Sequence, residues 1–243
     1  HWANADGSSL NADLELDGET LAHRCEHEFQ NNAFVAGVIE THATDLIGGN
    51  GPSLQVRSDS DAYNDAAERV WRDWWSMPDI AGTLSGPEML QQWIHLCWKR
   101  GEFVSQTVTD RTVRAGIKTR LNQIHPKRLM TPHDSAASTI RMGVELDRVG
   151  RRLAYHVLDA FAGDTDTLYN RSTSRILSKN IIHGFRQLEP GLVRGVPWMA
   201  PSLPTIAELR DFDTETLDAA RMAADQAVVF QATHPDVDFI EHQ

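Results

Sequence analysis

Apolar residues recur at intervals of three and four through residues 17–47, which is the spacing of an amphipathic helix. Asn31 and Asn32 lie in the middle of this pattern and are expected to divide it into two helices. Residues 1–16 are polar and without periodicity, so they predict an extended arm. After a glycine-rich turn, the short segment Ser53–Arg57 predicts a strand.

Two further helices are predicted before the chain reaches Gly101. The first covers Ser58–Trp75 and carries three tryptophans close together, Trp71, Trp74 and Trp75. Their spacing favours core or interface anchors over a base-stacking platform, because such platforms usually interleave aromatic with basic residues on a sheet or groove. The second helix begins at Ser85, where Glu88 three residues later completes a capping box.

The middle of the chain is rich in strand patterns. Residues 140–147 and 153–157 alternate between apolar and polar side chains, which predicts an antiparallel hairpin with one buried face. A polar loop is expected over Gly163–Ser174. Other short apolar segments predict strands around residues 103–108, 117–124 and 181–185.

Prolines punctuate residues 190–204, and a long helix is predicted after them. Thr205 is expected to cap this helix, with Glu208 as the acidic member of a capping box. The helical pattern runs to about Gln231, and at 1.5 Å per residue the helix would be roughly 40 Å long. Helices combined with antiparallel strands make the predicted fold class α+β.

The net charge of the chain is unevenly distributed. Its 243 residues include 34 acidic and 23 basic residues, a net charge of −11. Residues 1–50 sum to −8, residues 51–204 to +4 and residues 205–243 to −7. An acidic long helix argues against gripping nucleic acid, because tight binding to phosphates needs basic residues, but it does not exclude DNA as a neighbour.

The sequence disfavours two classes of protein, those that span a membrane and those that depend on a disulfide framework. No apolar run approaches the length of about 18 residues that a membrane helix needs. The cysteines, Cys25 and Cys97, are too few for a disulfide framework and are interpreted as buried or incidental thiols of an intracellular protein.

Candidate catalytic and metal-binding motifs are weak. His23 and His27 share a helical face, as two zinc ligands would, but no second ligand pair follows at a recognised spacing. Gly48–Gly51 lacks the Lys and Ser/Thr of a phosphate loop, and no nucleophile elbow occurs. A metal-dependent hydrolase that uses the two histidines and a generic protein-interaction module are the alternatives to a structural role.

A combination of glycine, aromatic and charged residues is spread, in order, over nearly the whole chain. It consists of Asn31, Asn32, Ala33, Gly37, Gly48, Gly51, Trp71, Trp74, Gly101, Glu102, Gly143, Val144, Glu145, Asp147, Gly150, Arg151, Ala154, Tyr155, Ile181, Ile182, His183, Phe185, Pro190, Gly191, Arg194, Gly195, Val196, Pro197 and Trp198. This combination resembles the portal proteins of lambda-type tailed phages. Glu189 and Leu192 depart from the Arg and Gln that the family tends to have on either side of the Pro-Gly pair.

The resemblance implies a portal-like wing domain, with helices packed on antiparallel strands, followed by a long stem helix. Residues 1–16 would be the extended arm, 17–200 the wing, 201–232 the stem helix of the tunnel, and 233–243 the start of the clip or a disordered end. Whole portal chains are longer, so this chain is expected to be truncated to the wing and the first stem helix.

The resemblance also implies a function. Portal proteins are structural subunits of a ring, typically a dodecamer, through which genomic DNA is packaged and ejected at one capsid vertex. It therefore implies no enzymatic activity, no cofactor, no metal and no membrane partner. The expected partners are further copies of the chain, double-stranded DNA bound without sequence specificity, the terminase large subunit, a head-completion or adaptor protein, and capsid or scaffold protein. The expected location is the portal vertex of a phage or prophage virion, and the host cytoplasm during assembly.

Two groups of residues are candidates for this function. On the stem helix, four acidic and two basic side chains are expected to face the tunnel or the next subunit, namely Glu208, Asp211, Glu215, Asp218, Arg210 and Arg221. Structural roles at the junction between the last strand and the stem helix are expected for His183, Arg194, Gly195 and Trp198.

Overall fold

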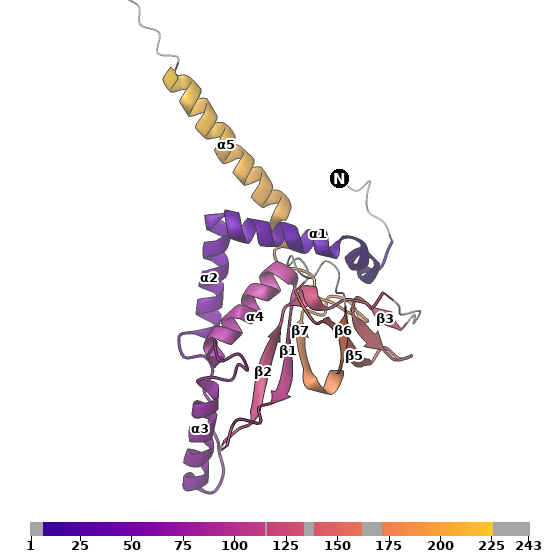
Figure 1. Cartoon of the computed structure of the whole chain (residues 1–243). Coiled ribbons are helices and arrows are strands. Elements are labelled where there is room, and N and C mark those ends of the chain that lie inside the picture. Colours follow the sequence, from indigo (N-terminus) through magenta and orange to yellow (C-terminus); the bar gives the residue numbers. More distant parts are fainter. Residues whose placement is uncertain (1–6, 115, 134–138, 162–171, 226–243) are drawn as a thin grey trace, which may run out of the picture. The chain divides into compact units, whose positions relative to one another are not determined.

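The computed structural model describes residues 7–114, 116–133, 139–161 and 172–225. The chain divides into two compact units, the first ending at Pro201 and the second beginning at Ser202. Figure 1 follows the chain from indigo at its N-terminus to yellow at its C-terminus. The α+β class predicted from the sequence is confirmed, and the assignment of the two units to a wing and a stem stays a prediction.

The first unit begins with helices α1 (Leu10–Asn31) and α2 (Ala33–Ile47), which confirms the predicted division of the long helical pattern. Asn32 makes the break because its backbone is extended, with φ −119° and ψ 106°. Its side-chain oxygen then accepts hydrogen bonds from the N–H groups of Phe34 and Val35, which caps α2.

The predicted extended arm over residues 1–16 is wrong from Leu10 onward, where α1 already begins. Ser9 caps the helix by accepting a hydrogen bond from the Ala12 N–H at 3.3 Å. The Asn11 side chain holds the first turn in place, since it donates to the Gly191 carbonyl and accepts from the Val193 N–H. These partners are 180 residues or more away in sequence, so local periodicity did not reveal the helix.

Helix α3 (Asp61–Trp75) buries no residue. Trp71 and Trp75 stack with their ring centroids 5.2 Å apart, and Trp74 donates its indole N–H to the Thr119 carbonyl at 2.6 Å. The Trp75 ring also lies so close to Gly86 that a Cβ at that glycine would overlap it. The three tryptophans therefore anchor α3 to the body while staying partly exposed.

Helix α4 (Gly86–Arg100) has the predicted capping box, in which the Ser85 N–H donates to Glu88 Oε2 at 2.8 Å. Helices α1 and α2 pack against α4, and α4 packs against the first strand of the sheet. Cys25 and Cys97 are buried as free thiols, as expected. Burial raises the pKa of Cys25 to about 11 and that of Cys97 to about 12, so both stay protonated and unreactive near neutral pH.

Two antiparallel sheets follow the helices. The first has the strand order β2-β1-β7 and the second the order β3-β4-β5-β6. Their strands are β1 (Glu102–Thr109), β2 (Thr119–Ile124), β3 (Ile140–Arg141), β4 (Val144–Leu146), β5 (Arg152–Leu158), β6 (Thr173–Leu177) and β7 (Ile181–Phe185). The apolar faces of both sheets meet in one core, which contains Val104, Ile124, Leu129, Val144, Tyr155, Val157 and Val193.

The predicted strand over residues 140–147 is wrong as a single element, because a tight turn divides it into β3 and β4. Met142 and Gly143 form this turn with φ values of 48° and 81°. The backbone of Met130 also passes within 2.6 Å of where a Cβ on Gly143 would lie. The predicted pairing of this region with residues 153–157 is confirmed as β4 against β5.

The predictions for residues 53–57 and for the end of the 163–174 loop differ from the structure. Among the described residues, the first segment has no neighbouring strand to pair with, and the second has one. Residues 53–57 form no strand; the N–H of Val56 donates instead to the Glu68 carboxylate of α3. The expected loop over residues 163–174 ends in strand β6, which pairs with β5, and residues 163–171 lie outside the described part of the chain.

The described part of the second unit is the long helix α5 (Leu203–Asp225). A short 3₁₀ turn at Ala200–Ser202 precedes it, so Thr205 lies inside the helix and the predicted cap at that position is wrong. The expected extension to Gln231 falls outside the described residues. Among the helices described, none combines the length and apolar character needed to cross a bilayer.

The turn at Gly143 provides a test of this architecture. Gly143→Ala forces a methyl group against the Met130 backbone and strains a positive φ, so we expect a loss of about 2–4 kcal/mol in the free energy of unfolding, measured by urea denaturation. Gly150→Ala is the matched control, because Gly150 has φ 83° but nothing within 4 Å of the added methyl. It should lose only about 1 kcal/mol, and equal losses in both variants would contradict the close approach.

Candidate functional site

Glu102, the first residue of β1, is the centre of a buried polar cluster. Only 2 % of the residue is exposed. Its Oε1 accepts a hydrogen bond from Arg194 Nε at 2.6 Å, and its Oε2 accepts from His183 Nε2 and from the Gly195 N–H, both at 2.9 Å. Both carboxylate oxygens are therefore fully engaged, as a buried charge requires.

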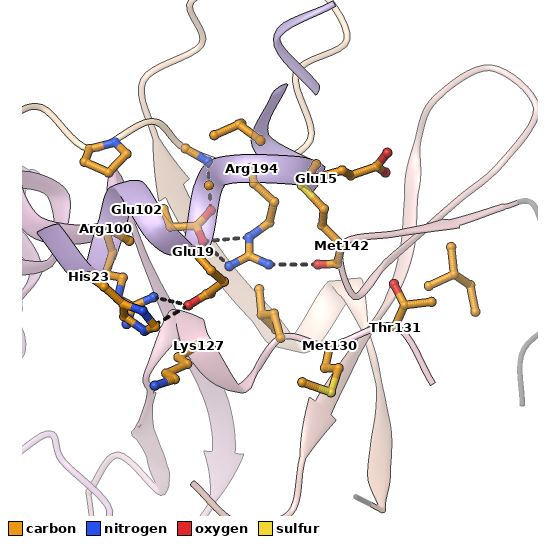
Figure 2. Close-up of a pocket in the computed structure, with 17 residues that line it drawn as sticks. Glu15, Glu19, His23, Arg100, Glu102, Lys127, Met130, Thr131, Met142 and Arg194 are labelled. Atoms are coloured by element: carbon orange, nitrogen blue, oxygen red, sulfur yellow. Dashed lines mark hydrogen bonds and ion pairs between the residues drawn. The ribbon is translucent and has the colours of Figure 1, made fainter. Parts of the chain in front are cut away.

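Arg194 uses the rest of its guanidinium to join separate parts of the chain. It donates from Nη1 to the Met142 carbonyl at 2.8 Å and from Nη2 to the Pro126 carbonyl at 3.0 Å. Figure 2 shows the guanidinium lying between the Glu102 carboxylate and the Met142 carbonyl. One side chain thus connects the segment before the long helix to β1, the β3–β4 turn and the residues after β2.

His183 extends the cluster onto β7. Its Nε2 contacts Glu102, and its Nδ1 lies 3.2 Å from the hydroxyl of Tyr155. Since a carboxylate can only accept, the proton sits on Nε2, and in the neutral ring Nδ1 accepts from the tyrosine. The histidine therefore links the two sheets, because Tyr155 belongs to β5.

Two glycines allow the segment of Arg194 to reach the cluster. A Cβ on Gly195 would overlap the carbonyl of Gly101, and a Cβ on Gly101 would overlap the backbone of Val196. The two stretches of main chain are in direct contact, which brings the Gly195 N–H to the carboxylate.

The electrostatics of the cluster follow from burial and pairing. Burial alone would raise the pKa of Glu102, but the Arg194 charge and the hydrogen bond from His183 lower it to about 2. Burial lowers the pKa of His183, since desolvation outweighs the attraction of Glu102. At neutral pH the cluster therefore consists of an ionised Glu102, a charged Arg194 and a neutral His183.

Trp198 stands apart from this cluster. Its backbone N–H donates to the Cys97 carbonyl at 3.2 Å, and its ring meets those of Trp98 and His42 edge-on, with centroids 6.1 and 6.3 Å away. It therefore attaches the segment before α5 to the end of α4 and to α2.

The sequence-predicted junction residues thus fall into two places. His183, Arg194 and Gly195 meet around one carboxylate, and Trp198 packs on the helices. Sequence reasoning missed Glu102 as a site residue, although it had noted the Gly101-Glu102 pair. The signal was a carboxylate at the start of an otherwise uncharged strand. Leu192, one of the departures from the family pattern, is buried, and its carbonyl accepts from Arg152 at 3.2 Å.

A cavity of about 580 Å³ adjoins the cluster, beneath α1 (Figure 2). Several charged side chains of its lining are paired, since Arg100 donates to Glu19 at 2.9 Å and Arg194 to Glu102. Much of the remaining lining is apolar, including Leu129, Met130 and Met142. The paired charges around this cavity stabilise the fold.

The candidate residues of α5 are all exposed. At 100° per residue, the four acidic side chains fall within an arc of about 80° on one side of the helix. A broader face outside this arc carries exposed apolar residues, among them Leu209, Phe212 and Leu217, together with Asp213, while the exposed Met222 lies inside the arc. Arg210 and Arg221 lie between the two faces and form ion pairs within the helix, with Asp211 at 3.8 Å and Asp218 at 3.0 Å.

The metal alternative gains no support from the described residues. His23 Nε2 lies 3.4 Å from a Glu19 carboxylate oxygen, which gives it a partner on the exposed surface of α1. Over the ranges that the structure describes, His, Cys, Asp and Glu side chains form no group of three or more placed to hold a metal ion.

Comparison with known protein families shows to which family the chain belongs. The family described as "Phage portal protein, lambda family" matches residues 1–242. The chain belongs to this family. Among solved structures, it is similar to a chain of "Neck of empty GTA particle computed with C6 symmetry", a label that describes only that particle. The identity is 13 % and the TM-score 0.49, over 88 % of this chain and 47 % of that one, so the present chain spans about half its length.

The ion pair at the centre of this portal-family chain can be tested directly. Glu102→Gln leaves the Arg194 guanidinium without a counter-charge in a largely buried site, where its side chain is 13 % exposed, so we expect a loss of about 3–5 kcal/mol in the free energy of unfolding. Glu15→Gln is the matched control, because Glu15 pairs with Arg141 at the surface, where the two side chains are 40 % and 43 % exposed. That variant should lose less than about 1 kcal/mol. Similar urea midpoints for both variants would show that the buried Glu102–Arg194 pair contributes no more to the free energy of unfolding than the surface pair does.

The same cluster makes the stability depend on pH. The pKa values of Glu102 and His183 are both lowered in the folded protein, so the folded state binds fewer protons than the unfolded state. Stability is therefore expected to fall below about pH 6.5 as unfolded His183 is protonated, and more steeply from about pH 4.3 towards the Glu102 pKa of about 2. Urea midpoints from pH 8 to pH 3 measure this. Glu102→Gln should flatten the lower part of the curve, and an unchanged slope would contradict the assignment.

Proposed function

We propose that the protein is a structural subunit of the portal ring, through which genomic DNA enters and leaves the particle at one capsid vertex. The family match over residues 1–242 is the observation that carries this proposal. The proposed partners are further copies of the chain, double-stranded DNA without sequence specificity, the terminase large subunit, a head-completion or adaptor protein, and capsid or scaffold protein. ATP hydrolysis would belong to the terminase, and assembly would take place in the host cytoplasm.

Helix α5 supports a role in an assembly because it lacks a core of its own. It has 23 residues and buries none of them. Leu209, Phe212 and Leu217 are 53 %, 63 % and 59 % exposed. Apolar side chains gain about 25 cal/mol for each Å² removed from water, so this apolar face favours packing against further protein. We assign that protein to neighbouring copies of α5 in a ring.

The acidic side of α5 suits a channel through which DNA slides. Basic residues bind phosphates strongly because they release condensed counterions, and such binding would hold the DNA in place. The arc of Glu208, Asp211, Glu215 and Asp218 instead repels phosphates. With the apolar face against neighbours, this arc would point towards the channel, and the pairing of Arg210 and Arg221 within the helix reduces the basic charge available to DNA.

The buried cluster around Glu102 would support the ring mechanically. It fixes Arg194 and Gly195, which lie only a few residues before α5, to both sheets of the first unit. Trp198 fixes the next residues to α4 and α2. We infer that these contacts fix the last segment of the first unit, from Arg194 to Trp198, in each subunit.

Imaging and DNA binding of the full-length protein test the proposal together. The unmodified protein should form rings with a central channel. A variant with Glu208, Asp211, Glu215 and Asp218 all changed to Lys should bind DNA at least about tenfold more tightly at low salt, with a steeper loss of affinity as salt rises. In a packaging assay, DNA should stay bound inside the rings of this variant instead of sliding through them.

A control variant separates the acidic arc from a general charge effect. Changing four acids of the first unit to Lys, namely Asp13, Asp17, Asp110 and Glu189, alters the net charge equally but leaves α5 intact. That variant should bind DNA less tightly than the α5 variant. If unmodified protein forms no ring, the portal role is wrong; if rings form but both variants behave alike, only the orientation of the arc is wrong.

A further inference from the structure

Two sides of the first unit differ in composition and lie apart. Figure 1 shows α2 and α3 along one side and the labelled strands β3, β5 and β6 along the other, with α4 and β1 between them. We call the exposed surface of α2 and α3 the helix flank. The sheet flank is the exposed surface of β5 and β6 together with the β4–β5 turn at residues 147–151 and the residues after β6, 178–179.

The helix flank presents apolar and aromatic side chains that the described residues leave exposed. Phe34 and Val38 of α2 are 80 % and 56 % exposed, and Tyr63 and Val70 of α3 are 63 % and 42 % exposed. Helix α3 has apolar residues at helical spacing along one face and still buries no residue. Apolar surface that is contiguous along one helix, as at Phe34 and Val38, is typical of a protein interface.

The sheet flank has fewer apolar side chains, and within the described residues these too are exposed. Val149 at the β4–β5 turn is 75 % exposed, and Leu153 of β5 and Leu177 of β6 are each 43 % exposed. Among the strands that the structure describes, β6 is the last of its sheet. An exposed edge strand has unpaired backbone groups along one side and is a ready site for contact with another chain.

The two flanks carry opposite charges. Residues 33–75, which include α2 and α3, hold seven acidic and three basic residues, a net charge of −4. The described residues 139–161 and 172–179, which include β3 to β6, hold six basic and three acidic residues, a net charge of +3. Within the described structure, no ion pair engages Asp61 and Asp65 on one flank or Arg148 and Arg151 on the other.

We propose that the helix flank of one copy docks against the sheet flank of the next copy. Complementary charge and uncovered apolar surface on both flanks support a second copy as the occupant. A contact between two different surfaces is head-to-tail, and it closes into a ring when the rotation between copies allows closure. This inference rests on the proposed ring and assigns its subunit contact to named surfaces outside α5.

Charge reversal on one flank at a time tests the contact in the full-length protein. Asp61→Arg with Asp65→Arg makes the helix flank basic, and Arg148→Glu with Arg151→Glu makes the sheet flank acidic. Each variant alone sets like charges against each other at every contact, so the fraction of protein in rings should fall at least about tenfold. Circular dichroism and thermal unfolding establish that each variant is folded.

An equimolar mixture of the two variants distinguishes a head-to-tail contact from a contact between two identical flanks. In the mixture, the basic helix flank of one variant meets the acidic sheet flank of the other, and the two unreversed flanks meet as well. Rings should therefore reappear, with the two variants alternating. No loss of rings in either variant, or folded variants whose mixture stays unassembled, would overturn the contact.

A matched control tests whether the loss of rings is specific to the flanks. Arg24 and Arg186 are exposed bases outside both flanks, so Arg24→Glu with Arg186→Glu should assemble like the unmodified protein. A loss of rings equal to that of the flank variants would show a general effect of added negative charge and would overturn the inference. If the unmodified protein forms no ring, the proposed function fails together with it; rings that survive both flank variants reject only this contact.

Discussion

The buried charge of Glu102 is the constraint on which the first unit depends. A carboxylate out of water must be paired and hydrogen-bonded, and two separate segments provide its partners: β7 through His183, and the segment before α5 through Arg194 and Gly195. Arg194 in turn bonds two carbonyls from the turns around the sheets. The two sheets, their turns and the approach to the long helix are thereby fixed to one another by a single group of side chains.

Helix α5 presents the contrasting case, in which stability must come from outside the helix. A helix that buries none of its residues gains little from its own hydrogen bonds, because packing of an apolar face supplies most helical stability in proteins. The apolar face and the acidic arc of α5 are both exposed and lie on different sides of the helix. The exposed apolar face of this helix is the physical feature that the proposed ring would cover.

Local sequence signals predicted those parts of the fold whose stabilising contacts are local. The Asn32 break and the Ser85–Glu88 capping box depend on groups within a few residues, and both were correct. The same reasoning failed where a distant partner decides the structure. Residues 53–57 form no strand because Val56 bonds to α3, whereas the polar β6 segment becomes a strand because β5 lies beside it.

The sequence by itself determined the helices, most of the strands, the division at Asn32, the acidic long helix and the relationship to portal proteins, because these follow from periodicity, capping and residue identity. Only the tertiary structure decided that α1 begins at Leu10 through its bonds to residues near Gly191, and that His183 and Arg194 share one carboxylate on Glu102. It also placed the acidic helix flank and the basic sheet flank on separate sides of one unit. The reason is physical: the partners in these contacts are 81 to 180 residues apart, and only folding brings them within hydrogen-bonding distance.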